Sequence, residues 1–242
     1  MKVFVIIPTY NEKENIGGLV KRVLALPVSA EAVVVDDNSP DGTGALLDSL
    51  AAGEPRLHVL HRPGKLGLGT AHVAGLRYAL GKGADLLVTM DADLSHDPAY
   101  IPAMLEAAAG CDLVIGSRYT AGGGAVNSPL PRRALSRGAN LFAKIMLGLR
   151  AGDCTAGFRC YRAAVLRALD LDAIVADGYS FLIEILSAIE ARGFTVGEVP
   201  IKFMDRELGA SKISRKEISK AVYTVLRLAF RPASAREGGK RA

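Results

Sequence analysis

The sequence predicts an α/β protein with a mostly parallel central sheet flanked by helices. Three observations favour this fold class. Five short runs rich in β-branched residues alternate with helical patterns, half of the 242 residues are hydrophobic, and no internal repeat or long low-complexity linker breaks the alternation. A chain of this length and composition can bury a substantial core, so we expect one large domain with a short appendage.

The expected strands are apolar runs bounded by turn-forming residues, and helical patterns separate them. Strands are expected at residues 2–7, 30–35, 56–61, 85–90 and 112–117. Helices are expected at residues 12–26, 42–52, 69–80 and 98–109. Helix-start chemistry supports the second of these helices, which follows "SPDGT", and the fourth, which Asp97 and Pro98 precede. Because helices connect successive strands, we expect parallel pairing.

Two later stretches combine apolar and basic residues in a helical pattern. Residues 130–149 have a basic first half and an apolar second half, and residues 213–230 have apolar residues at helical spacing with four basic residues among them. Either stretch can lie on a lipid surface or pack on the main domain. We therefore divide the chain into a main domain at 1–212, an amphipathic helix at 213–230 and a flexible basic tail at 231–242.

Composition narrows the partners and the compartment. The net charge of +5 suggests an anionic partner, and the absence of Trp and of any nucleic-acid motif makes nucleic acid the weakest choice. Three cysteines, Cys111, Cys154 and Cys160, show no zinc-site or disulfide spacing, which fits a reducing compartment. Neither a signal peptide nor an apolar stretch of transmembrane length is visible, so we expect a cytoplasmic protein.

Polar motifs follow each of the five expected strands. In chain order they are "PTYNE", "DDNSPDGT", "HRPGKLGLGTA", "DADLSH" and "GSRY". The carboxyl ends of parallel strands lie at one edge of a sheet, where open α/β sheets bind their ligands. The sequence therefore predicts a single crevice lined by residues from five strand ends.

Two aspartates in the fourth motif indicate a metal site. Asp91 and Asp93 stand two residues apart where the chain leaves an apolar strand, so an extended backbone presents both carboxylates on one face. Carboxylates this close need a cation, and hard divalent cations prefer oxygen ligands. We expect Mg²⁺ or Mn²⁺ between these carboxylates and a substrate diphosphate.

Together with "SRGAN", "DCTAGFRCYR" and "GEVPIKFMDRELGASK", these motifs make the chain resemble the dolichol- or polyprenol-phosphate mannosyltransferases of the inverting glycosyltransferase family 2. The resemblance runs from about residue 3 to residue 212. It implies a Rossmann-like nucleotide-diphospho-sugar transferase fold of GT-A type, with residues 1–212 as the catalytic domain. The implied reaction moves mannose from GDP-mannose to a polyprenyl (dolichyl) monophosphate with inversion.

Two other functions stay open at the level of sequence. A UDP-glucose or other UDP-sugar transferase has the same motifs, because a base-edge acid serves guanine or uracil. An inactive nucleotide-sugar-binding subunit is the second alternative, although the presence of both Asp91 and Asp93 argues against it. The membrane partner also stays open, since the resemblance is compatible with peripheral contact at the cytoplasmic face or with a separate membrane-anchoring protein.

The resemblance also implies roles for individual residues. The catalytic set is Asp91, Asp93 and Arg118, with Asp93 as metal ligand and Asp91 sharing the metal shell. The nucleotide-sugar set is Pro8, Tyr10, Glu12, Val35, Asp37, Lys65, Asp91, Ala92, Asp93, Arg118, Arg206 and Lys212. The set for the acceptor phosphate is Arg132, Arg133 and Ser136. Some family members place Gln two residues after the metal aspartate, where this chain has Ser95.

Overall fold

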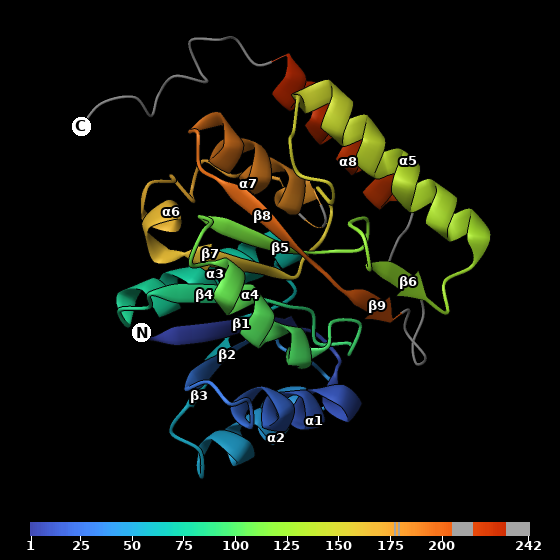
Figure 1. Ribbon diagram of the computed structural model, residues 1–242. Helices are drawn as coiled ribbons and strands as arrows, with labels where there is room; N and C mark the ends of the chain where they lie inside the picture. The colour runs from blue at the N-terminus through green and yellow to red at the C-terminus, as the bar shows by residue number, and fades with distance from the viewer. Residues whose placement is uncertain (177, 179, 205–214, 231–242) are drawn as a thin grey trace.

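Seven strands form one twisted sheet at the centre of the protein (Figure 1). The computed structural model describes residues 1–176, 178, 180–204 and 215–230. The strands of this sheet are β1 (Val3–Thr9), β2 (Ala30–Asp36), β3 (Leu57–His61), β4 (Leu86–Thr89), β5 (Leu113–Ser117), β7 (Arg159–Arg162) and β8 (Val196–Pro200). Their order is β3-β2-β1-β4-β7-β5-β8, and β7 is antiparallel to both β4 and β5. The other pairs are parallel, which confirms the predicted fold class.

Helices cover both faces of this sheet. One face carries α1 (Lys13–Leu24), α2 (Thr43–Ala51), the short η1 (Pro98–Tyr100) and α4 (Ile101–Ala107). The other face carries α3 (Leu68–Gly81), α6 (Ala163–Arg167) and α7 (Ser180–Ala191). The helices expected near α1, α2, α3 and α4 are all present, and the five expected strands are β1 to β5.

The alternation of side chains along β1 explains the two cores. Phe4 and Ile6 pack with residues of α3 and α7, whereas Val5 and Ile7 pack with residues of α1 and α4. All four side chains are fully buried. A strand with helices on both of its faces needs apolar residues at every position, and this is the run that the sequence carries.

Two helices lie side by side outside α7, namely α5 (Leu130–Leu147) and α8 (Arg215–Ala229) (Figure 1). Ala143 of α5, Ile183 of α7 and Val225 of α8 form a small buried cluster that joins them. Both helices were expected from the sequence. Among the described residues, no helix combines the length and the apolar character needed to cross a membrane.

A second, two-stranded sheet pairs β6 (Gly124–Val126) with β9 (Lys202–Met204). Neither strand was predicted, and neither were β7 and β8. The small sheet begins soon after β5 and β8 end. A backbone hydrogen bond from Gly124 to the carbonyl of Ile201 joins its two strands at their start. The small sheet therefore extends the protein beyond the carboxyl edge of the main sheet, next to the first turns of α5 (Figure 1).

Candidate active site

The carboxyl ends of the parallel strands lie at one edge of the sheet, as the sequence predicted. Thr9 pairs with Asp36 and Asp36 with His61, so β1, β2 and β3 end level with one another. Because β7 is antiparallel, its first residue, Arg159, lies at the same edge and pairs with Thr89. The polar motifs after these strands therefore converge at this edge.

Asp37, predicted to bind the nucleotide, is clamped by an arginine that sequence reasoning missed. Arg62 donates through Nε and Nη2 to the two carboxylate oxygens of Asp37, at 2.5 and 2.6 Å. The same guanidinium donates to the carbonyl of Gly67 and the hydroxyl of Thr70, at 2.9 and 2.8 Å. Both carboxylate oxygens of Asp37 are therefore fixed by Arg62, which also ties the start of α3 to Asp37.

Other residues predicted to bind the nucleotide sugar lie near the start of α1. The ammonium of Lys65 lies 4.3 Å from the ring centre of Tyr10, a cation–π contact that brings the glycine-rich motif to the "PTYNE" motif. Glu12 accepts a hydrogen bond from the Asn15 side chain at 2.9 Å. Val35 is fully buried in the core, so its backbone, and not its side chain, is what it can offer a ligand.

The "DADLSH" turn is fixed by its own side chains. Ser95 donates to Asp93 Oδ1 from its amide at 3.1 Å and from its hydroxyl at 2.6 Å. The amide of Asp91 donates to Nδ1 of His96 at 3.0 Å. Burial lowers the pKa of His96, against the opposing charges of Asp91 and Asp93, so the ring is a neutral acceptor at Nδ1. Ser95 thus orients the expected metal ligand.

Arg118 is held by a buried carboxylate. Its Nε and Nη2 donate to Asp153 at 2.8 Å each, and Nη2 also donates to the Thr155 hydroxyl at 2.7 Å. Burial alone would raise the pKa of Asp153, but the hydrogen bonds and charge of Arg118 outweigh it and keep the pKa below its usual value. Nη1 of Arg118 has no acceptor among the described residues, so it can serve a substrate oxygen.

The helix α5 brings the predicted acceptor residues to this edge. Ser136 Oγ lies 2.8 Å from the hydroxyl of Tyr119, the residue after Arg118. Arg132 and Arg133, both half-buried, lie one turn before Ser136 on α5. The predicted acceptor set is therefore linked through Tyr119 to the fifth strand end.

The asparagine of "SRGAN" explains that motif. Asn140 donates to the carbonyl of Gly152 and accepts from the amide of Cys154, each at 2.7 Å. These bonds fix the loop that carries Asp153. Motifs that are distant in the sequence are joined here by direct hydrogen bonds.

A fully buried arginine lies beneath the same loop. Arg159 donates to the carbonyl oxygens of Ala156, Leu182 and Cys154 at 2.8, 2.8 and 3.0 Å. It is 0% exposed. Three carbonyl acceptors partly compensate the loss of water, and they also fix the turn between Cys154 and Ala156.

Two predicted donor residues, Arg206 and Lys212, lie outside the described residues, as does the predicted tail at 231–242. Within the described ranges, no group of three or more His, Cys, Asp or Glu side chains is arranged to hold a metal ion. The aspartates of the "DADLSH" turn would therefore need substrate oxygens or water to complete a metal shell.

Comparison with known proteins decides the family. The model of the glycosyl transferase family 2 matches residues 4–170. The chain belongs to glycosyl transferase family 2. Two similar members narrow the match: an undecaprenyl-phosphate mannosyltransferase from Micrococcus luteus is 48% identical over 94% of this chain and 93% of its own length. A polyprenol monophosphomannose synthase from Mycolicibacterium smegmatis is 48% identical over 93% of this chain and 85% of its own length. These relatives confirm the resemblance seen in the motifs.

Solved structures share the fold of this family 2 member. A glucosyl-3-phosphoglycerate synthase from Mycobacterium tuberculosis, solved with Mn²⁺, UDP and glucosyl-3-phosphoglycerate, gives a TM-score of 0.66 at 19% identity, over 96% of this chain and 81% of that one. A mannosyltransferase from Pyrobaculum calidifontis, solved with GDP-Man and Mn²⁺, gives a TM-score of 0.58 at 18% identity, over 93% of this chain and 69% of that one. Both likenesses confirm the GT-A type fold.

Three residues of this family 2 site were not predicted, namely Arg62, Asp153 and Arg159. Each lies inside a motif that the sequence analysis quoted, but each acts through another protein group. Arg62 holds Asp37, Asp153 holds Arg118, and Arg159 holds backbone carbonyls. The available signal was a charged residue inside a polar motif, and this signal does not identify the group that the residue contacts.

Proposed function

We propose that this protein transfers mannose from GDP-mannose to a polyprenyl monophosphate and gives polyprenyl-phosphate mannose with inversion at the anomeric carbon. The observation that carries the proposal is the 48% identity, along 94% of the chain, to a protein named undecaprenyl-phosphate mannosyltransferase. The carboxyl edge of the sheet supports it, because suitable side chains are present there for each chemical task of the transfer.

The donor nucleotide is assigned to the ends of β1 and β2. Arg62 occupies one lone pair on each oxygen of Asp37, so the carboxylate can still accept from the N–H groups of a guanine edge. Tyr10 offers stacking area to a base. Lys65, exposed beside that ring, offers a cation to the diphosphate. Arg206 and Lys212 are assigned to the same diphosphate on the family resemblance alone.

Asp91 and Asp93 fit a Mg²⁺ or Mn²⁺ ion. Both offer hard carboxylate oxygens, and Ser95 fixes the Asp93 carboxylate. These cations usually take one or two carboxylates together with water and substrate phosphates, so a third protein ligand is not required. When bound, such an ion stabilises negative charge that accumulates on the leaving diphosphate.

The acceptor requires charge compensation more than a general base. A phosphate monoester is already anionic near neutral pH, so no proton has to be removed before its oxygen attacks the anomeric carbon. The new C–O bond forms on one face of the sugar while the bond to GDP breaks on the other, which inverts the configuration. Arg118, Arg132 and Arg133 provide the cations, and Ser136 a hydroxyl, that bring two anions together.

Peripheral membrane contact is assigned to the outer faces of α5 and α8. Leu141 and Ile145 of α5 are 56% and 69% exposed, and Tyr223 and Phe230, on α8 and directly after it, are 69% and 77% exposed. The two helices lie side by side (Figure 1). The exposed Arg137 stands four residues, or about one helical turn, before Leu141 in α5. This combination suits the boundary between headgroups and acyl chains of an anionic bilayer.

The test is a transfer assay with labelled donors. The purified protein is incubated with Mg²⁺, polyprenyl phosphate and either labelled GDP-mannose or labelled UDP-glucose, and the label in the lipid fraction is counted. We expect mannose to enter lipid as the β-anomer, with glucose transfer at background. Efficient transfer from UDP-glucose, or from GDP-mannose only to a non-lipid acceptor, would refute the proposal. In the same assay Asp93→Asn should reduce transfer strongly. Its matched control is Asp97→Asn, which removes a nearby carboxylate that pairs with Arg22.

A further inference from the structure

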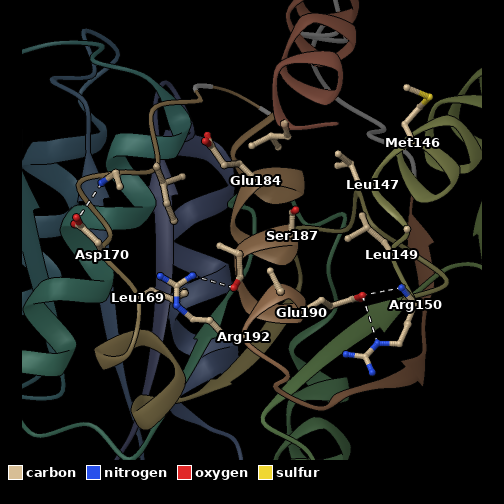
Figure 2. A pocket seen from close by; sticks show the side chains of 16 residues that line it. Met146, Leu147, Leu149, Arg150, Leu169, Asp170, Glu184, Ser187, Glu190 and Arg192 are labelled. Atoms are coloured by element: carbon tan, nitrogen blue, oxygen red, sulfur yellow. Dashed lines mark hydrogen bonds and ion pairs between the residues drawn. The ribbon is translucent and has the colours of Figure 1, made fainter. Parts of the chain in front are cut away.

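Glu184 of α7 is a buried carboxylate that joins two separate parts of the protein. Its Oε1 accepts from the Arg227 guanidinium of α8 at 2.7 Å, and its Oε2 accepts from the backbone amide of Ala176 at 2.7 Å. The side chain is 4% exposed. It lies on the wall of a cavity of about 780 Å³ that Leu228 of α8 also lines (Figure 2). The two contacts compensate a carboxylate this buried for its loss of water.

Ala176 in turn lies against the start of α3. Its carbonyl oxygen is 2.9 Å from the position that a Cβ on residue 69 would take, so Gly69 leaves room that a side chain would fill. The carbonyl of Gly67, two residues earlier, accepts from Arg62, which clamps Asp37. A continuous series of contacts therefore runs from α8 through Glu184 to the acid assigned to the donor base.

An apolar face of α8 is turned outward. Val222, Tyr223 and Leu226 are exposed, whereas Val225 is buried against α5 and α7. The helix thus presents one apolar face outward, and Arg227, 29% exposed at the flank of that face, reaches inward to Glu184. A surface that binds the outer face can hold α8 in place. Glu184, which bonds to Arg227 of α8 and to Ala176, connects the position of α8 to the residues near the donor site.

We propose that Glu184 is a positioning residue that couples α8 to nucleotide-sugar binding. Holding Arg227 with one oxygen and Ala176 with the other, it transmits the position of the outer helix to the start of α3 and thereby to Arg62 and Asp37. Binding of α8 to a lipid surface then favours the donor-binding arrangement, so the enzyme holds its nucleotide sugar more tightly at the membrane. This inference rests on the proposed function, because it takes the donor site and the membrane face from there.

The experiment measures GDP binding by calorimetry with Mg²⁺, with and without phosphatidylglycerol vesicles that contain no polyprenyl phosphate. Wild type is compared with Glu184→Gln, Arg227→Met and the charge-conserving Arg227→Lys. Arg192→Met is the matched control, since Arg192 lines the same cavity (Figure 2) but lies directly after α7 and donates to the carbonyl of Ala188 in that helix. Initial rates with GDP-mannose separate KM from kcat.

We expect vesicles to tighten GDP binding by wild type and by Arg192→Met about two- to thirtyfold, the range typical of residues that couple two sites. Glu184→Gln and Arg227→Met should lose this response and raise the KM for GDP-mannose with kcat nearly unchanged, and Arg227→Lys should restore part of it. An equal vesicle response in wild type and Arg227→Met, or a loss confined to kcat, would overturn the inference. If wild type binds no GDP at all, the donor assignment itself is wrong, and the coupling is overturned with it.

Discussion

We predict that His72 makes this protein less stable as the pH falls below 6.5. The ring, on α3, is 1% exposed and stacks on Phe181 with 5.5 Å between ring centres. Neither ring nitrogen has a hydrogen-bond partner within the described part of the chain. Burial lowers the pKa of His72 from 6.5 to about 3, and the nearby Arg159 and His96 act in the same direction.

The direction and size of the change in unfolding free energy with pH follow from the difference between the pKa values of His72 in the folded and unfolded states. Between pH 6.5 and pH 3 the unfolded chain protonates this histidine while the folded protein keeps it neutral. Stability is therefore complete above pH 6.5 and falls as the pH decreases. For these two pKa values the free energy of unfolding should drop by about 2 kcal/mol between pH 7 and pH 5. His72→Phe keeps a ring for stacking and removes the titration, so it should remove this part of the drop.

The assay is urea unfolding followed by circular dichroism at pH 5, 6 and 7. The quantity compared is the change in unfolding free energy with pH, so a constant packing cost of the larger Phe ring cancels. His61→Asn, which removes a half-exposed histidine, is the control and should retain the steep loss because His72 remains. Identical pH dependence of wild type and His72→Phe would show that His72 is not the group responsible.

Three further variants test the site. Asp93→Asn should reduce mannosyl transfer at least about a hundredfold while the protein stays folded, and near-normal, EDTA-sensitive activity would exclude Asp93 as an essential ligand. Arg133→Ala should raise the KM for polyprenyl phosphate roughly tenfold to a hundredfold and leave GDP binding unchanged; equal losses would move Arg133 to the donor site. Asp153→Asn leaves Arg118 without its buried partner and should lower the unfolding free energy by about 3–5 kcal/mol at pH 7. Because the pKa of Asp153 lies below 3.8, this difference should persist above pH 3.8 and shrink only at lower pH, and a flat difference would argue against the pair.

The central strands could be predicted because consecutive apolar residues indicate a strand that is buried on both faces. A run such as Val3 to Ile7 is apolar at every position, and this is what a strand between two helical layers requires. In contrast, β7 carries Arg159 and Arg162 at its two ends, and β8 contains Gly197 and Glu198. Their place in the sheet depends on partners such as Gly152, which donates its amide to Glu198, and local sequence does not reveal these.

The same distinction applies to the site. Asp91, Asp93 and Arg118 could be selected because they follow strands and because their chemistry suits metal and phosphate. The role of Asn140 could not, since its amide bonds to a loop that begins twelve residues later in the sequence. Ser95 stands where some family members have Gln, and only the structure shows that its hydroxyl is bonded to Asp93 Oδ1.

The ion pairs at this edge also determine where the acceptor can find positive charge. Asp153 neutralises Arg118, and Asp37 neutralises Arg62, so these two arginines contribute direction more than net charge. Holding both guanidinium groups in place before substrates arrive lowers the entropy lost when two anions are brought together. We assign the net attraction for a lipid phosphate to other cations, namely those of α5 such as the half-buried Arg133. This is why their replacement should act on the acceptor requirement, whereas replacement of Asp153 should act on stability and on the orientation of Arg118.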